Sequence, residues 1–242
     1  MGGERDTDVA DVADVAAVAR VLASPARTAM LELLLDGRAH PAGDLAREAG
    51  VALSTASAHL AELAEADLVN AEPSGRQRRY RLTKPEVARA IEALAVVAPR
   101  RRVSSLRTAS AAERLREGRT CYDHLAGRLG VALTDALVAR RALRGRDGAF
   151  DVTRSGERLL GSMGVDVGVA RERRRPLTLA CADWTERRSH LAGALGAELC
   201  DRLFELGWIA RRGSGRAVAL TDSGSTRLRE LIGLDVETTG RR

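Results

Sequence analysis

The stretch LSTASAHLAEL, residues 53 to 63, has the period of a helix but an unusually smooth outer face. Leu60 and Leu63 recur at helical spacing, with Ala56 one turn earlier, and this pattern predicts one buried side. The other side carries small or hydrogen-bonding side chains: Ser54, Thr55, Ala58 and His59. Such a face suits a helix that must approach another molecule closely.

The segments before this helix place it second in a helix-turn-helix. Ser24 and Pro25 read as a helix N-cap followed by proline at the first helical position. His40-Pro41 is expected to open the next helix, and Gly50 to end it. The predicted helices before the quoted one are 8–23, 25–37 and 41–50. In a helix-turn-helix the second helix enters the DNA major groove, which is about 12 Å wide.

A basic hairpin is predicted directly after the quoted helix. In DLVNAEPSGRQRRYRL, residues 67 to 82, two strand-like pieces flank the turn Pro73-Ser74-Gly75. The turn, the second piece and the residues just after it are strongly basic: Arg76, Arg78, Arg79, Arg81 and Lys84. A basic wing beside a recognition helix contacts the DNA backbone and adds salt-dependent affinity. A further helix is expected over 85–98.

We predict DNA contacts from the recognition helix and the wing together. The candidate residues are Ser54, Thr55, Ser57, Ala58, His59, Arg76, Arg78 and Arg79. Hydroxyls and imidazole can hydrogen-bond phosphates or base edges, and Ala58 or the Thr55 methyl can touch a thymine methyl. The alternative is an ordinary amphipathic helix with a solvated face, and the neighbouring wing favours DNA contact over it.

Four short motifs occur together within residues 15 to 98. They are Leu22…Pro25-x-Arg27, Asp44-Leu45-Ala46, Ser54-Thr55-x-Ser57-x-His59-Leu60 and Gly75-Arg76…Tyr80-x-Leu82. As a set they resemble the winged-helix repressors of the ArsR/SmtB family. The resemblance implies a homodimer built from the first helix and the helix after the wing, bound to a palindromic operator of double-stranded DNA.

The chain departs from that family at its familiar sensing positions. Ala52 and Leu53 stand where a capping serine or another polar residue is common. The third helix has no cysteine, and the helix over 85–98 has no histidine or aspartate. Metal sensing is therefore not implied by the resemblance.

The second half contains an internal repeat. HLAGRLGVALTDAL at 124–137 matches HLAGALGAELCDRL at 190–203 in nine of fourteen positions. The fold is therefore predicted to be mainly α with small β-hairpins, in two domains. We expect a winged helix-turn-helix and dimerisation domain over 8–98, an arginine-rich linker over 99–118, and a C-terminal domain over 119–242. Its repeat units lie near 121–161 and 181–233, and they are expected to pack together.

Each repeat carries cysteine, aspartate and histidine near its start. The two sets are Cys121, Asp123 and His124, and Cys181, Asp183 and His190. Thiolate, carboxylate and imidazole suit zinc or another thiophilic metal, so two copies meeting across a pseudo-twofold axis would form one effector, metal or redox site. The alternative is structural, with cysteines as buried small hydrophobes and histidines that support a helix start. No cofactor is required by the sequence, and the effector is unknown.

Composition sets the broad class. Of 242 residues, 45% are apolar but only 2% are aromatic, which indicates an aliphatic core of packed helices. The formal charge is +6, almost all of it from arginine, which points to nucleic acid unless codon bias accounts for the arginines. Three cysteines make no disulfide framework. An acidic N-terminus and the lack of a long apolar run predict a cytoplasmic protein.

The sequence-based function is a dimeric transcriptional regulator, more specifically a repressor, whose C-terminal domain senses an effector or stabilises the dimer. Motifs for catalysis are missing from the sequence: there is no glycine-rich phosphate loop, nucleophile elbow or histidine-glutamate metal helix. Two alternatives stay open. One is a metal- or thiol-dependent sensor or enzyme seated in the C-terminal domain, and the other is a winged helix used for protein contact.

Overall fold

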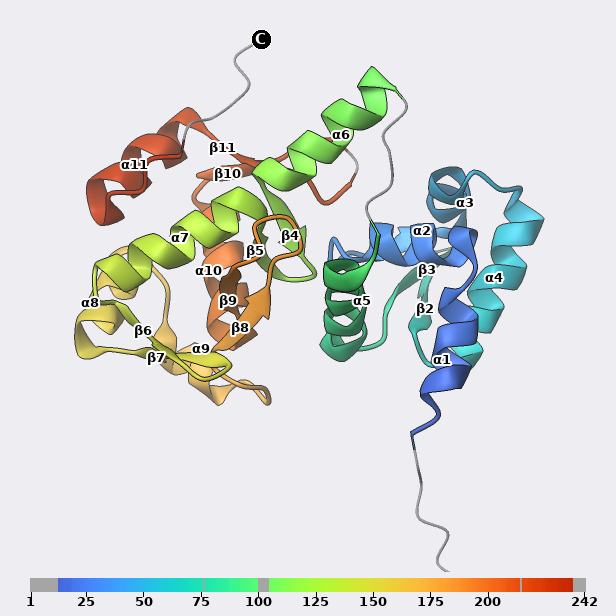
Figure 1. Cartoon of the computed structure of the whole chain (residues 1–242), viewed down its shortest axis with the longest axis horizontal. Helices are drawn as coiled ribbons and strands as arrows, with labels where there is room; N and C mark the ends of the chain where they lie inside the picture. The colour runs from blue at the N-terminus through green and yellow to red at the C-terminus, as the bar shows by residue number, and fades with distance from the viewer. Residues whose placement is uncertain (1–12, 76, 100–104, 214, 237–242) are drawn as a thin grey trace, which may run out of the picture.

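The N-terminal half folds as a winged helix (Figure 1). The computed structural model describes residues 13–75, 77–99, 105–213 and 215–236. The N-terminal elements are α1 (Val15–Leu22), α2 (Pro25–Leu34), β1 (His40–Pro41), α3 (Ala42–Ala49), α4 (Leu53–Glu65), β2 (Val69–Ser74), β3 (Gln77–Leu82) and α5 (Pro85–Val97). The three strands form one antiparallel sheet in the order β1-β3-β2. The predicted winged helix-turn-helix is thus present.

Local capping explains where the N-terminal helices begin and end. Ser24 caps α2 as predicted, its hydroxyl accepting from the Arg27 N–H at 3.5 Å, and Gly50 ends α3 in the left-handed conformation. The expectation that His40-Pro41 opens a helix is wrong. These residues form β1 at the sheet edge, and α3 starts at Ala42. Proline is tolerated there because an edge strand leaves its missing N–H unneeded.

The N-terminal core is aliphatic, as the composition predicted. Ala56, Leu60 and Leu63 of α4 are fully buried against residues of α2 and α3. Each fully buried leucine side chain contributes about 1.5–3 kcal/mol relative to exposure. The core therefore fixes which face of α4 points outward.

The C-terminal half begins inside the segment predicted to be a linker. Its elements are α6 (Leu106–Glu117), β4 (Arg119–Cys121), β5 (His124–Ala126), α7 (Gly127–Ala139), β6 (Leu143–Arg146), β7 (Ala149–Val152), α8 (Arg154–Ser162), α9 (Val167–Glu172), β8 (Leu179–Ala182), β9 (Ser189–Ala192), α10 (Gly193–Glu205), β10 (Ile209–Arg211), β11 (Val218–Leu220) and α11 (Asp222–Ile232). Much of 99–118 is therefore helical, while residues 100–104 lie outside the described ranges.

Helix α6 forms in this arginine-rich segment because Ser105 provides an N-cap for it. The Ser105 hydroxyl accepts from the Thr108 N–H at 3.2 Å and caps the helix. Glu113 pairs with Arg116 at 3.5 Å and with Arg128 of α7 at 3.3 Å. These ion pairs are compatible with a helix that packs on α7.

Hairpin, helix, hairpin and helix follow one another twice in this half. The first set is β4, β5, α7, β6, β7 and α8, and the second is β8, β9, α10, β10, β11 and α11. Even the caps correspond, since Thr153 accepts from the Gly156 N–H at 2.9 Å and Thr221 from the Gly224 N–H at 3.0 Å. The domain and repeat boundaries drawn from the sequence stay predictions.

The two sets interlock across one aliphatic core. Helix α7 packs on β9 of the other set, and α10 packs on β5. Within each set, Gly130 and Gly196 let the helix lie close to its own hairpin, because an added Cβ would lie 2.5 Å from the Leu125 carbonyl oxygen and 2.7 Å from that of Leu191. Backbone bonds also cross, with the Thr120 N–H donating to the Arg216 carbonyl at 2.9 Å. Each set therefore completes the other.

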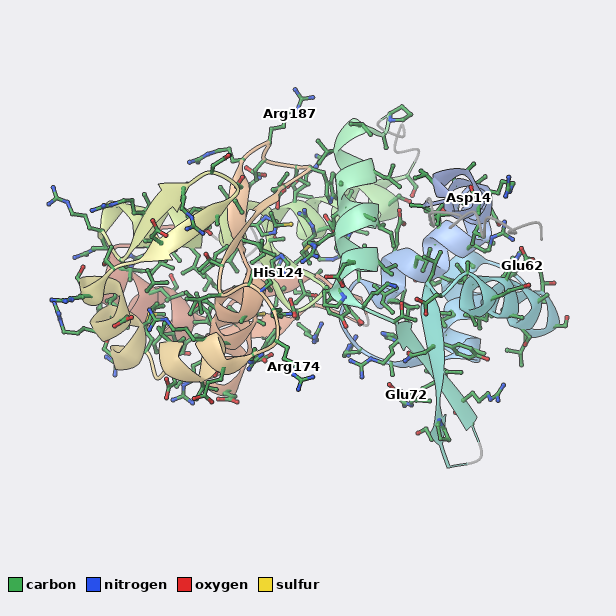
Figure 2. The ribbon with its side chains drawn as sticks, turned by 90° about the horizontal axis from the view of Figure 1, so that it is seen from below. Asp14, Glu62, Glu72, His124, Arg174 and Arg187 are labelled. Carbon is green, nitrogen blue, oxygen red and sulfur yellow. The ribbon has the colours of Figure 1, made fainter. Side chains whose placement is uncertain are left out.

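Helix α5 lies between the two halves, and the wing projects away from the body of the molecule (Figures 1 and 2). The turn between β4 and β5 docks on the N-terminal half, where the Tyr122 N–H donates to the Leu35 carbonyl at 2.7 Å. The β4–β5 hairpin is thus joined directly to the winged helix. In the part of the chain that the structure describes, no helix has the length and apolar character that a membrane span requires.

Candidate functional site

The outer face of α4 is exposed and carries the predicted small polar side chains. Ser54, Thr55 and Ala58 are exposed, whereas His59 is partly buried, with 21% of its side chain accessible. Ser57 is also exposed, but its hydroxyl donates to the Leu53 carbonyl at 2.9 Å. This hydroxyl can therefore only accept a hydrogen bond from another molecule. The face can therefore approach a flat or grooved surface closely.

The N-terminus of α4 has no side-chain cap. Ala52 occupies the N-cap position and makes no capping hydrogen bond, as its sequence indicated. The N–H groups of the first turn are consequently left for water or for an anionic ligand, to which the positive end of a helix is attractive. A DNA phosphate is a ligand of this kind.

The predicted wing arginines differ in whether their side chains form hydrogen bonds or ion pairs within the chain. Arg79 donates from Nη1 to the Ala39 carbonyl at 3.1 Å, which ties the wing to the loop before β1. Arg78 is exposed and makes no hydrogen bond or ion pair to the residues described. Arg76 lies outside the described residues. The remaining cations are paired, Arg81 with Glu72 at 3.3 Å and Lys84 with Asp67 at 2.9 Å. Arg78 is therefore the described wing cation best placed for a phosphate.

A second group of chemically active side chains meets between the two first hairpins of the repeats. In β4–β5, Cys121 lies directly across from His124, and in β8–β9, Cys181 lies across from His190. One ligand atom from each of the four lies within 4.8 Å of the others. The two sulfur atoms are 3.9 Å apart, and the histidine ring centroids are 5.1 Å apart. The sequence sets thus come together, as the pseudo-twofold interpretation expected.

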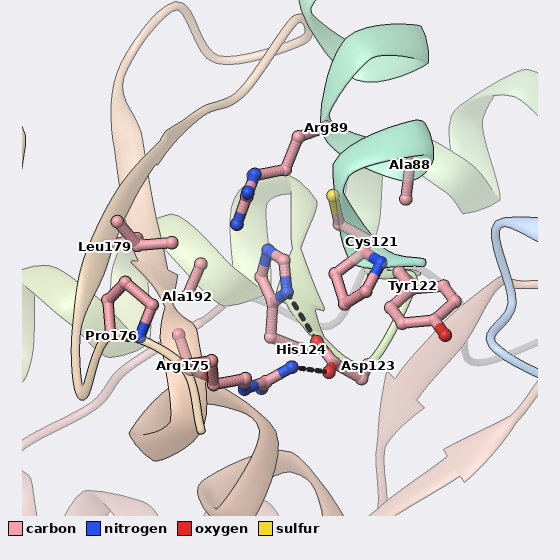
Figure 3. Close-up of a pocket in the computed structure, with 12 residues that line it drawn as sticks. Ala88, Arg89, Cys121, Tyr122, Asp123, His124, Arg175, Pro176, Leu179 and Ala192 are labelled. Atoms are coloured by element: carbon pink, nitrogen blue, oxygen red, sulfur yellow. Dashed lines mark hydrogen bonds and ion pairs between the residues drawn. The ribbon is translucent and has the colours of Figure 1, made fainter. Parts of the chain in front are cut away.

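The two aspartates of the sequence sets lie behind the histidines. Asp123 Oδ1 lies 3.1 Å from His124 Nδ1. Figure 3 marks this contact with a dashed line. Asp183 Oδ2 is 3.3 Å from His190 Nδ1, although the pair is not aligned for a hydrogen bond. The Nε2 atoms of both histidines are buried and have no partner among the described residues. Asp123 therefore orients the His124 ring, whereas Asp183 lies near His190 without a hydrogen bond to it.

The electrostatics of this cluster favour charged groups. Burial alone would lower the pKa of His124, but Asp123 and Cys181 outweigh it and raise that pKa to about 9. Hydrogen bonding to Cys121 lowers the pKa of the Cys181 thiol, burial opposes the shift, and the histidines reinforce it. Cys200 lies apart in the core, where burial raises its thiol pKa. The hydrogen bond to Cys181 and burial raise the pKa of the Cys121 thiol. Of the three cysteines, only Cys181 therefore sits where a thiolate is stabilised.

A buried ion network adjoins the cluster and was missed by sequence reasoning. Arg119 is fully buried and donates to Asp183 Oδ2 at 3.0 Å, with its guanidinium carbon 4.8 Å from the centre of the Trp184 ring. Its other carboxylate neighbour is Glu92 of α5, at 3.7 Å. Glu92 also pairs with Arg216. The available signal was Glu92 itself, an acid among the apolar residues of α5.

The N-terminal half defines a winged helix-turn-helix protein, and comparisons with known proteins agree. The family described as "Helix-turn-helix domain" matches residues 22–72. The chain is 42% identical over 204 residues to the uncharacterized HTH-type transcriptional regulator YdfF of Bacillus subtilis, covering 84% of this chain and 90% of that protein. It is 44% identical over 78 residues to the HTH-type transcriptional regulator CmtR of Mycobacterium tuberculosis, covering 32% of this chain and 65% of that one.

Two solved structures resemble the N-terminal half alone. One is the homodimeric winged helix-turn-helix DNA-binding domain of a possible ArsR-family regulator from Mycobacterium bovis, 35% identical, covering 40% of this chain and 89% of that one, with a TM-score of 0.35. The other is the cadmium metal-sensor CMTR from Mycobacterium tuberculosis, 36% identical, covering 38% and 99%, with a TM-score of 0.30. From the match to YdfF over most of both sequences, the chain belongs to the HTH-type transcriptional regulators.

Proposed function

We propose that the chain is a homodimeric repressor that binds a palindromic DNA operator, with α4 in the major groove. The exposed, small and polar face of α4 beside a basic wing carries this proposal. Thr55 and His59 are the base-reading candidates, because hydroxyl and imidazole groups can hydrogen-bond base edges. Ser54 and Arg78 are placed for phosphates, which position the protein without reading sequence.

The dimer is supported by apolar side chains that the single chain leaves uncovered. They lie on α1 and α5, the helices that dimerise according to the family resemblance: Val15, Val18, Leu94, Val96 and Val97. Val15 and Val97 are 75% and 79% exposed, and Leu94 is 51% exposed. A second copy that buries these faces accounts for apolar side chains in such exposed positions.

The proposed function assigns no catalytic step to any residue. Its ligand is double-stranded DNA, so the proposed place of action is the cytoplasm.

A selection from random duplexes tests this function. The full chain should enrich an inverted repeat whose half-sites lie about 10–10.5 base pairs apart, or a multiple of that distance, because two-fold protein symmetry imposes two-fold sequence symmetry. One dimer should bind each enriched duplex. Enrichment of no sequence, or of an asymmetric site bound by a single chain, would contradict the proposal.

Loss of Arg78 should weaken binding to all duplexes alike. If Arg78 neutralises one phosphate, Arg78→Ala should reduce the slope of log affinity against log salt by about 0.9 per chain. Affinity measured across a salt series checks this.

Arg174→Ala is the matched control for that experiment. Arg174 is exposed on the C-terminal half, and its loss changes the net charge equally (Figure 2). Its salt slope should stay that of the unmodified protein. Equal slopes for both variants would show that Arg78 acts only through overall charge.

A further inference from the structure

We propose that Cys121, His124, Cys181 and His190 bind one zinc ion as a closed four-ligand site between the two repeats. Each hairpin supplies one cross-strand cysteine–histidine pair, and the two pairs meet face to face. A site made in this way needs both repeats, since neither provides more than two ligands.

The spacing of the ligand atoms fits a tetrahedral zinc ion. Zinc–sulfur bonds of about 2.3 Å at tetrahedral angles place two sulfurs about 3.8 Å apart. Cys121 Sγ and Cys181 Sγ are 3.9 Å apart. One ring nitrogen of each histidine falls within the same 4.8 Å set. Small movements of side chains would therefore complete the coordination.

The chemistry of the four ligands selects the class of metal. Two thiolates with two imidazoles suit zinc and other thiophilic divalent ions, whereas magnesium and calcium prefer oxygen ligands. Four protein ligands also leave no open position for a reacting water, so the site would be structural or sensory. The buried Nε2 atoms of His124 and His190 have no hydrogen-bond partner among the described residues. A bound metal ion would provide a partner, because it accepts a lone pair from each nitrogen that coordinates it.

The surroundings provide the support that zinc-binding histidines usually have. A carboxylate behind the ring fixes its orientation and strengthens its bond to the metal. Asp123 occupies this position behind His124, and Asp183 Oδ2 lies 3.3 Å from His190 Nδ1. Asp123 is held in turn by Arg175, 2.5 Å away, and Asp183 by Arg119. A metal-binding centre is thus braced on both sides.

A small cavity lies beside the cluster. It has a volume of about 20 Å³ and borders Cys121 and His124 between α5 and the C-terminal hairpins (Figure 3). Cys181 is only partly buried. The ligands are therefore not completely enclosed by the surrounding core.

Zinc titration of the full chain, stripped with a chelator under reducing conditions, tests the site. Elemental analysis should give one zinc per chain. Cobalt substitution should show the visible absorption of a tetrahedral ion together with thiolate charge-transfer bands. The measurement involves no DNA, so its failure would leave the proposed DNA binding untouched.

Variants separate this site from adventitious binding. Cys121→Ser and His124→Gln should each abolish stoichiometric zinc, whereas Cys200→Ala, which removes the distant core cysteine, should keep it. Asp123→Asn should retain one zinc with affinity lowered about 10–100-fold, because only the support of His124 is lost. Circular dichroism identifies any variant that fails to fold. If a ligand variant fails to fold, the zinc affinity of the Asp123→Asn variant is the measurement that tests the site instead.

Three results would overturn the proposal. The first is less than a tenth of an equivalent of zinc in the unmodified protein. The second is equal binding by the Cys121→Ser variant and the unmodified chain. The third is a Cys121–Cys181 disulfide that forms readily in the presence of excess zinc, which would make the pair a redox site instead.

Discussion

Replacing Arg119 with alanine is expected to lower the free energy of unfolding by about 3–5 kcal/mol. The substitution would leave Glu92 and Asp183 as buried carboxylates without their shared cation, and removing one partner of a buried ion network has a cost of this size. It would also remove the guanidinium from the face of Trp184. Urea unfolding followed by tryptophan fluorescence gives the measurement.

The control for Arg119 is an exposed ion pair in the same half. Arg227 and Glu230 of α11 are 3.2 Å apart and largely accessible to solvent. Arg227→Ala should cost at most about 1 kcal/mol, because solvent screens such pairs. If Arg119→Ala had an effect as small as the control, the description of Arg119 as a fully desolvated partner of two carboxylates would be wrong.

Leu60→Ala should destabilise the N-terminal half by about 2–5 kcal/mol. Leu60 is fully buried and holds α4 against the rest of the core, so truncation removes apolar contacts and leaves a cavity. Hydrogen exchange of the α4 amides reports this loss locally, which is suitable for a chain of two halves.

Leu53→Ala provides the comparison on the same helix. Leu53 is 57% exposed at the start of α4, so its truncation should change stability by no more than about 0.5 kcal/mol. Equal protection of the α4 amides in both variants would mean that the buried and exposed faces of this helix have been assigned incorrectly.

The ion network also connects the proposed zinc ligands to the helix that is proposed to dimerise. His190 contacts Asp183, Asp183 binds Arg119, and Arg119 lies 3.7 Å from Glu92 on α5. The turn after Cys121 meets the end of α2 through the Tyr122 N–H. Any rearrangement of the cluster would therefore act on elements that position α4.

Much of the N-terminal half could be predicted because its signals are local. The period of Leu60 and Leu63, the Ser24 cap and the turn at Gly75 each act over a few residues, and all of them agree on the winged helix. The Cys and His sets were predictable for a different reason. Their repetition implied two equivalent positions, and packed repeats bring equivalent positions together.

The remaining features depend on contacts that are distant in sequence. Arg119 directly follows the arginine-rich segment 99–118, and no local pattern marks it as buried, because its partner Asp183 is 64 residues away. Leu94 and Val97 are apolar residues of the predicted helix over 85–98, but the sequence pattern does not reveal whether the same chain or a second copy covers them. The role of Asp123 and Asp183 behind the histidines likewise required the positions of both hairpins.

The most direct test of DNA reading by α4 is a base-by-base measurement of operator preference. For Thr55→Ala or His59→Ala, preference should fall by roughly 1–3 kcal/mol at one symmetric pair of operator positions, because a base contact is lost. For Arg78→Ala, overall affinity should fall while the preference stays the same. Unchanged preference after both substitutions in α4 would contradict the assignment of this helix as the reader of DNA sequence.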